Sequence, residues 1–272
     1  MGYSKAERSV LTVLCVLALV LFLSRPAGAM HIMEGYLPPQ YCVAWGVVCL
    51  PFLVLGVMSL RRTLKENRRL LILLAMSGAF IFVISSLKIP TFFGSSSHMT
   101  GTGLAAILFG VTSTSILGMI VLIFQAVMLA HGGITTLGAN TFSMAIAGPM
   151  VAWFLFKAGN KLKVNRMVTI FIAAMFGDLF TYCVTSVQLA LAYPSQVGGV
   201  AASAIKFLAV YAPTQVPLAI VEGILTVLII MGLESISSGE LAGLSSPKSA
   251  EPSADISFKK GKMEGENDES NN

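Results

Sequence analysis

Ala-Gly-Ala-Met-His-Ile-Met-Glu-Gly, residues 27–35, follows an apolar run with the features of an export signal. Lys5 and Arg8 precede that run, which covers residues 10–23. A basic start, an apolar run of about 7–15 residues and an Ala-x-Ala site are typical of a secretory signal peptide. The run is also shorter than the ~20 residues that a membrane-spanning helix needs. Residues 1–29 are therefore predicted to be a cleaved signal peptide, with an uncleaved anchor helix as the alternative.

Cleavage before Met30 would create a metal chelate at the new N-terminus. The free Met30 amine, the His31 backbone nitrogen and the His31 Nδ1 can bind one ion through a five-membered and a six-membered ring. Such nearly coplanar nitrogens favour the tetragonal geometry of Ni(II) or Cu(II) and could impose it on Co(II). A fourth nitrogen would complete this site. The alternative is a terminal histidine that is simply solvated.

The composition indicates an all-α integral membrane protein. Hydrophobic residues make up 55% of the 272 residues and charged residues only 11%, with a mean hydropathy of +0.80. Soluble domains carry about 25% charged residues. The net charge of +5 is then interpreted as loop charge that orients the chain, not as a nucleic-acid surface. Zinc-protease, serine-hydrolase and nucleotide-binding motifs are absent from the sequence, so neither an enzyme nor an ATPase is predicted.

The apolar segments predict about seven transmembrane helices in residues 30–233. These segments are residues 41–60, 70–87, 101–111, 116–130, 142–156, 167–192 and 214–233. A turn is expected at residues 112–115, and a short outer helix at residues 197–211. Basic residues in 61–69 and 157–166 predict cytoplasmic loops, hence an extracytoplasmic mature N-terminus and a cytoplasmic C-terminus in the cell membrane. Residues 234–272 are hydrophilic and are predicted to be a disordered cytoplasmic tail.

This orientation places all the histidines of the chain on the outer side. His98 follows a run of serines and is predicted to be a metal ligand. Its neighbours Ser97 and Thr100 are candidates for hydrogen bonds that orient the imidazole. His131 is a candidate fifth ligand, a hydrogen-bonding neighbour of the site or a helix-end residue. Asn140 is expected either to cap the fifth span or to form hydrogen bonds near the site.

Two acidic residues, Asp178 and Glu222, fall near the middles of predicted spans. Acidic side chains are costly inside a membrane and are functional candidates by default. No lysine or arginine lies at a matching depth in the sequence. The acids are therefore expected to be protonated or to pair with polar groups such as Gln125, Gln188 or Gln215, and they are not assigned to the metal.

Three motifs together resemble the CbiM/NikM family, the substrate-capture (S) components of energy-coupling factor importers for cobalt and nickel. They are residues 30–35, 97–103 and 129–140, and the resemblance covers about residues 30–233. It implies an S-component-like bundle. It also implies a four-nitrogen site made by the Met30 amine, the His31 amide and imidazole, and His98.

The resemblance also implies partners. Ala75 and Ala79 match the family's A-x-x-x-A contact with the transmembrane coupling (T) subunit, and small residues at this spacing let helices approach closely. Cytoplasmic ATPase subunits and a small auxiliary membrane protein (CbiN-like) complete the implied complex. The auxiliary protein is expected to be separate, because only a hydrophilic tail follows the last span, and this favours cobalt over nickel.

The expected function is capture of Co(II) for ATP-driven import that feeds cobalamin synthesis, with Ni(II) as the alternative ion. The metal would be the transported substrate and not a permanently bound cofactor. A stand-alone ion-coupled carrier that uses Asp178 and Glu222 as proton sites is a second alternative. A membrane metalloenzyme is a third, but the sequence offers no general base near the histidines.

Overall fold

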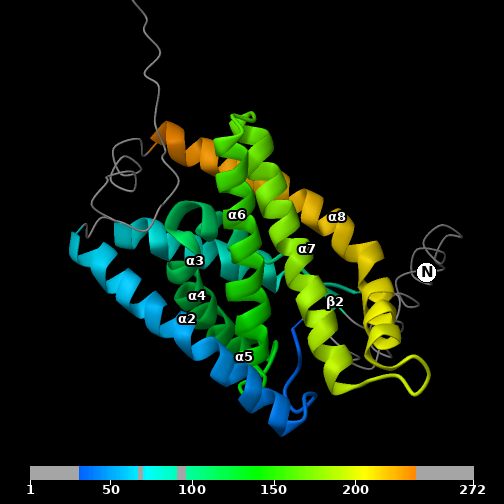
Figure 1. Cartoon of the computed structure of the whole chain (residues 1–272). Helices are drawn as coiled ribbons and strands as arrows, with labels where there is room; N and C mark the ends of the chain where they lie inside the picture. The colour runs from blue at the N-terminus through cyan, green and yellow to red at the C-terminus, as the bar shows by residue number, and fades with distance from the viewer. Residues whose placement is uncertain (1–30, 67–69, 91–95, 237–272) are drawn as a thin grey trace, which may run out of the picture.

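A computed structural model describes residues 31–66, 70–90 and 96–236, and these residues are nearly all helical (Figure 1). The helices are α2 (Pro39–Glu66), α3 (Leu70–Ser86), α4 (Thr102–Leu129), α5 (Leu137–Asn140), the π-helix η1 (Thr141–Ala147), α6 (Gly148–Lys161), α7 (Arg166–Ala192) and α8 (Gly199–Ile236). Strands β1 (Ile89–Pro90) and β2 (Ser96–Ser97) form a short antiparallel pair. The predicted signal peptide, residues 1–29, and residues 237–272 of the predicted tail lie outside the described residues.

Within the described residues, five helical stretches are long and apolar enough to cross a membrane, and α3 is a shorter apolar helix. The five are Pro39–Lys65, Thr102–Leu129, Leu137–Lys161, Arg166–Ala192 and Gly199–Ser235. The expected number of about seven separate spans is therefore not confirmed. The difference arises because the segments predicted at 101–111 and 116–130 form one helix, α4. The short outer helix predicted at 197–211 is likewise the start of α8, which ends at Ile236.

Helix α4 is interrupted at Gly110, not at the turn expected over residues 112–115. Gly110 has φ 78° and ψ 171°, a conformation that only glycine adopts without strain. Past it, the Thr114 Oγ1 donates a hydrogen bond to the Gly110 carbonyl at 2.8 Å, and the Ser115 Oγ donates one to the Thr112 carbonyl at 2.7 Å. Because these hydroxyls bond back onto the helix itself, the polar cluster continues the helix instead of ending it.

Helix α4 packs at the centre of the bundle, and α6, α7 and α8 lie side by side on one flank (Figure 1). The largest core cluster joins α3, α4, α6, α7 and α8 through Leu73, Leu104, Phe156, Ile170 and Ile230. Glycines bring α6 and α7 close together, since a Cβ at Gly177 would lie 2.9 Å from the Ala152 Cβ. Close approach through small residues is typical of membrane helices.

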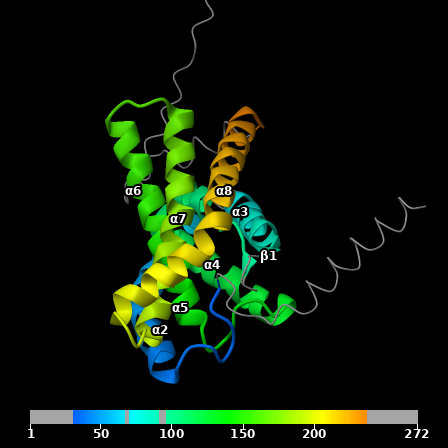
Figure 2. The same ribbon diagram turned by 90° about the vertical axis from the view of Figure 1, so that its right-hand side faces the viewer.

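Helix α8 changes direction along its length (Figure 2) and contains Pro213 and Pro217. Each proline removes a backbone donor from the helix, and prolines are the commonest cause of sharp helix bends. The residues around these prolines face the segment after β2. This part of α8 therefore lies next to His98.

Candidate metal centre

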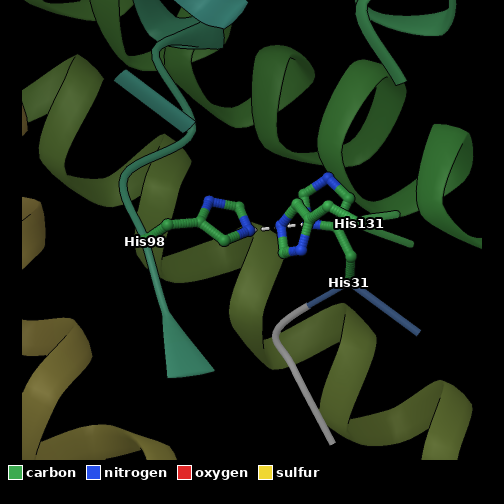
Figure 3. A group of neighbouring side chains, drawn as sticks. All are labelled: His31, His98 and His131. Carbon is green, nitrogen blue, oxygen red and sulfur yellow. Dashed lines mark hydrogen bonds between the residues drawn. The ribbon is translucent and has the colours of Figure 1, made fainter. Parts of the chain in front are cut away.

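The histidines of the chain come together from three separate segments (Figure 3). His31 precedes α2, His98 follows β2, and His131 lies between α4 and α5. Their exposed fractions are 3%, 0% and 3%, and one candidate ligand nitrogen from each lies within 4.8 Å of the others. No acidic side chain belongs to this group among the described residues. A buried cluster of imidazoles is a set of neutral nitrogen donors suited to a transition-metal ion.

The closest pair is formed by His31 and His98. The His98 Nε2 lies 2.6 Å from the His31 Nδ1 (Figure 3). The His98 Nδ1 is 2.9 Å from the Met99 carbonyl oxygen, which can only accept a hydrogen bond. This contact places the His98 proton on Nδ1 and leaves the Nε2 lone pair facing His31. Nitrogens that each lie about 2.0 Å from one ion at right angles are about 2.8 Å apart, so this pair is spaced like two adjacent ligands.

Two nitrogens of the cluster are unpaired. The Nε2 atoms of His31 and His131 have no hydrogen-bond partner among the described residues. Buried polar atoms without a partner are rare and costly. The His131 ring centroid lies 4.6 Å from that of His31 and 5.1 Å from that of His98, with no hydrogen bond to either ring. The unpaired nitrogens and the crowded rings favour a bound ligand at this point.

Burial keeps the imidazoles in the form that binds metal. Burial lowers the pKa of His31 well below its usual value, and the neighbouring His98, His131 and Lys88 lower it further. Burial also lowers the pKa of His98 to about 4, and Lys88 acts in the same direction. The pKa of His131 is lowered for the same main reason. All the imidazoles are therefore neutral near pH 7, as metal ligation requires.

Asn140 holds the backbone next to His31. The Asn140 Oδ1 accepts a hydrogen bond from the Ile32 N–H at 2.8 Å, and the Asn140 Nδ2 donates one to the Ile32 carbonyl at 3.0 Å. Thr136, which the sequence did not single out, donates its hydroxyl to the same carbonyl at 2.6 Å. Of the two roles considered for Asn140, the structure therefore shows hydrogen bonding beside the site; Asn140 is the last residue of α5.

The loop after His131 crosses the segment after His31 at very short range. The Gly132 carbonyl accepts a hydrogen bond from the Glu34 N–H at 3.2 Å. A Cβ on Gly133 would lie 2.6 Å from the Glu34 Cα, a distance too short for any side chain to fit there. Gly133 is thus required by the close approach of two backbones, and Gly132 by its φ of 75°; the sequence alone did not reveal this approach.

Ser97 and Thr100 form hydrogen bonds with α8, not with the imidazole of His98. The Ser97 Oγ lies 2.8 Å from the Thr214 Oγ1. The Thr100 N–H donates to the Glu222 Oε2 at 2.6 Å, and the Thr100 hydroxyl donates to the Glu222 Oε1 at 3.0 Å. These residues therefore fix the backbone on either side of His98. The expectation that they orient the ring directly is corrected to this indirect role.

The acidic residues also lie nearer to the site than the sequence suggested. Gln215, one of the glutamines considered as a partner, donates a hydrogen bond from its Nε2 to the Asp178 Oδ2 at 2.6 Å. The same Nε2 lies 3.2 Å from the His98 carbonyl, to which it also donates. One amide thus connects Asp178 to the backbone of a candidate ligand.

The remaining predicted residues are Met30, Ala75 and Ala79. Met30, whose amine was predicted to be a ligand, lies outside the described residues. Ala75 and Ala79 are both exposed on α3, so this face of the helix is open to a partner.

Comparison with known proteins identifies the family. Residues 31–239 match the family model CbiM, described as the cobalt uptake substrate-specific transmembrane region. The chain belongs to the CbiM family. CbiM members are transport proteins, which confirms the prediction of a transporter rather than an enzyme. The apolar helices confirm the prediction of a multi-pass membrane protein. The family description makes cobalt a transported substrate and not a resident cofactor.

Relatives in the CbiM family are similar over nearly their whole length. The cobalt transport protein CbiM of Lachnoclostridium phytofermentans is 62% identical over 241 residues, which cover 89% of this chain and 96% of the relative. The CbiM of Clostridium cellulovorans is 48% identical over 247 residues, covering 90% and 95%.

Two crystal structures share the CbiM fold seen here. One, described as a transition metal transporter, aligns with a TM-score of 0.68 and 26% identity over 80% of this chain and 98% of that one. The other, described as a truncated transition metal transporter, gives a TM-score of 0.67 at 27% identity, covering 75% and 98%. The helical arrangement is therefore that of known metal transporters.

Proposed function

We propose that this chain captures Co(II) at the outer face of the cell membrane, as the S component of an energy-coupling factor importer. The observation that carries the proposal is the contact of 2.6 Å between the His31 Nδ1 and the His98 Nε2. Both imidazoles are buried and neutral near pH 7. A pair of neutral nitrogens at this spacing is suited to a divalent transition metal.

The identity of the facing nitrogen supports the N-terminal chelate. Only the Nδ1 of a histidine can close a six-membered ring with the backbone nitrogen of the same residue. In His31 it is Nδ1 that faces His98. The proposed ligands are therefore the Met30 amine, freed by signal cleavage, the His31 amide and Nδ1, and the His98 Nε2. The amide must lose its proton to bind, so reprotonation inside the cell would favour release.

Import would depend on partner proteins. The chain has no nucleotide-binding motif of its own, so ATP would be hydrolysed by separate cytoplasmic subunits. The exposed Ala75 and Ala79 on α3 would contact the T subunit, because small side chains let another helix approach closely. A separate CbiN-like protein would complete the complex, and the imported cobalt would supply cobalamin synthesis. The mature N-terminus would be extracytoplasmic and the C-terminus cytoplasmic.

A binding experiment tests the metal site. Purified protein, with its N-terminus sequenced in the same sample, is titrated with Co(II) and with Ni(II). Wild type, His98→Ala and a variant with one residue inserted between Ala29 and Met30 are compared. We expect a mature end at Met30 and one Co(II) per chain in wild type, loss of binding in His98→Ala, and loss of the wild-type affinity and absorption spectrum in the insertion variant, whose terminal nitrogens are displaced by one residue. The same insertion placed within residues 237–272 is the control and should bind normally. Co(II) binding that survives the insertion before Met30 with the affinity and the absorption spectrum of wild type would exclude the Met30 amine as a ligand.

A transport experiment tests the energy source. Uptake of radioactive cobalt is measured in cells that express the chain with or without the coupling and ATPase subunits. Uptake should require the ATPase subunits and should fall when Ala75 or Ala79 is replaced by Leu, since the larger side chain blocks helix contact. Full uptake without the ATPase subunits would instead support a stand-alone carrier. Preferential uptake of Ni(II) over Co(II) would reassign the substrate to nickel.

A further inference from the structure

The segment that carries His98 lies along α8 residue by residue. Hydrogen bonds join Ser97 with Thr214, His98 with Gln215 and Thr100 with Glu222, and Met99 belongs to the same hydrophobic cluster as Leu218. Residue numbers rise together in the segment and in the helix, so the two run in the same direction. Three peptide steps span at most about 10–11 Å, and eight helical steps rise about 12 Å. The lengths match, which allows every residue of the segment to have its own partner on α8.

The polar partners on α8 are joined to an acid on α7. The Gln215 Nε2 donates to the Asp178 Oδ2 at 2.6 Å as well as to the His98 carbonyl at 3.2 Å. Glu222 accepts both the N–H and the hydroxyl of Thr100. Gln215 and Glu222 are 0% exposed and Asp178 is 1% exposed. The backbone on both sides of the His98 ring is therefore held by a buried network that spans two helices.

This network packs two membrane helices less favourably, in free energy, than apolar side chains would. Acidic side chains inside a membrane cost free energy that apolar side chains would not. The Asp178 Oδ1 and the Gln215 Oε1 are also without a hydrogen-bond partner among the described residues. A residue set that carries this cost, and that ends on the backbone of a candidate ligand, points to a role in metal binding.

We infer that Gln215, Glu222 and Asp178 are positioning residues that hold the His98 Nε2 at bonding distance from the metal. The inference rests on the proposed function, since it assigns the support of the same site. Gln215 fixes the carbonyl of His98 and Glu222 fixes the following turn through Thr100, while Asp178 orients the Gln215 amide. Without these contacts, the His98 segment is free to shift along α8, and its imidazole leaves the geometry that it shares with His31.

The test compares variants of the full-length protein in Co(II) titrations, with the Co(II) absorption spectrum and the melting temperature recorded on the same samples. Gln215→Met keeps the length of the side chain but removes its donor. We expect it to weaken Co(II) binding about 10- to 100-fold, as loss of an outer hydrogen bond to a ligand does. The spectrum of the bound ion should shift. Glu222→Leu should act in the same direction, and Glu222→Gln, which keeps an acceptor for the Thr100 N–H, should lose less.

Thr226→Val is the matched control. Thr226 lies one turn after Glu222 on α8, is 0% exposed, and its hydroxyl has no hydrogen-bond partner among the described residues. This variant should bind Co(II) with the affinity and spectrum of wild type. Gln215→Met is nearly isosteric, so it is expected to fold even if Glu222→Leu does not.

The outcomes separate the two proposals. If wild type binds Co(II) tightly and Gln215→Met has the same affinity and spectrum, the positioning role is wrong while the proposed function stands. If Thr226→Val loses affinity as strongly as Gln215→Met, the effect is general packing and the positioning role is again wrong. If wild type binds no Co(II), both the proposed function and this inference fail.

Discussion

The His31 Nδ1 and the His98 Nε2 lie 2.6 Å apart although different helices hold them. His31 is fixed through Ile32, whose backbone is bound on both edges by Asn140 at the end of α5. His98 is fixed through its carbonyl, which accepts a hydrogen bond from Gln215 on α8. The candidate site is therefore assembled at a junction, and a shift of α8 relative to α5 would separate the two nitrogens.

Loss of the Asn140 amide should damage the His31 side of this junction. In Asn140→Leu, the buried N–H of Ile32 loses its hydrogen-bond acceptor, while the Ile32 carbonyl loses one donor and keeps the Thr136 hydroxyl. Leaving such groups unpaired costs about 1–3 kcal/mol of unfolding free energy. We also expect Co(II) affinity to fall at least about 10-fold. Isothermal titration calorimetry and thermal melts measure the two effects, and wild-type affinity in a folded Asn140→Leu protein would contradict this role.

Gly133→Ala should separate the loop after His131 from the segment after His31. The added Cβ would lie 2.6 Å from the Glu34 Cα, so one backbone must move. We expect a lower melting temperature and weaker Co(II) binding. Gly232→Ala is the control, because nothing lies within 4 Å of its Cβ position and alanine favours a helix by about 1 kcal/mol. Equal melting temperatures of the two variants would show that the loop after His131 and the segment after His31 are not packed closely enough to exclude a Cβ.

His131 should matter less for binding than His98. Its ring is packed against His31 with centroids 4.6 Å apart, but it makes no hydrogen bond with the His31–His98 pair. We expect His131→Ala to keep one Co(II) per chain with an altered absorption spectrum, while His98→Ala loses the ion. Titrations with spectra recorded at each step distinguish the variants. Complete loss of Co(II) in His131→Ala would instead make His131 an obligatory ligand.

The metal-free protein should become less stable as the pH falls from neutral towards 4. Burial lowers the pKa of His98 to about 4, whereas an unfolded histidine has a pKa of about 6.5. Between these values the unfolded state binds more protons than the folded state, so the free energy of unfolding rises with pH. His31, whose pKa is also lowered by burial, acts in the same direction.

Thermal melts in detergent between pH 4.5 and 7.5 measure this dependence. His98→Asn should show a smaller change of melting temperature with pH, because one of the titrating groups is removed. The same slope in wild type and His98→Asn would mean that His98 does not titrate in this range.

Several features could be predicted because they depend on local sequence. The helical membrane fold follows from long apolar segments, and Gly110 interrupts α4 shortly before the turn that was expected over residues 112–115. The basic loops predicted that the histidines share one side of the membrane; their meeting in one cluster agrees with this, while the orientation of the chain stays a prediction. The number of spans was harder to predict, because hydropathy does not distinguish one kinked helix from two short helices.

The amino-acid sequence by itself determined the class of fold, the family motifs and the identity of the candidate ligands His31 and His98. Only the tertiary structure decided which residues support them. Hydrogen bonds join Asn140 to Ile32, Gln215 to His98 and Glu222 to Thr100, and the partners are 108, 117 and 122 positions apart in the sequence. Hydrophobic periodicity reports which face of a segment is buried but not which distant segment covers it. Contacts of this kind depend on how bent helices pack, and that packing is set by the whole bundle together.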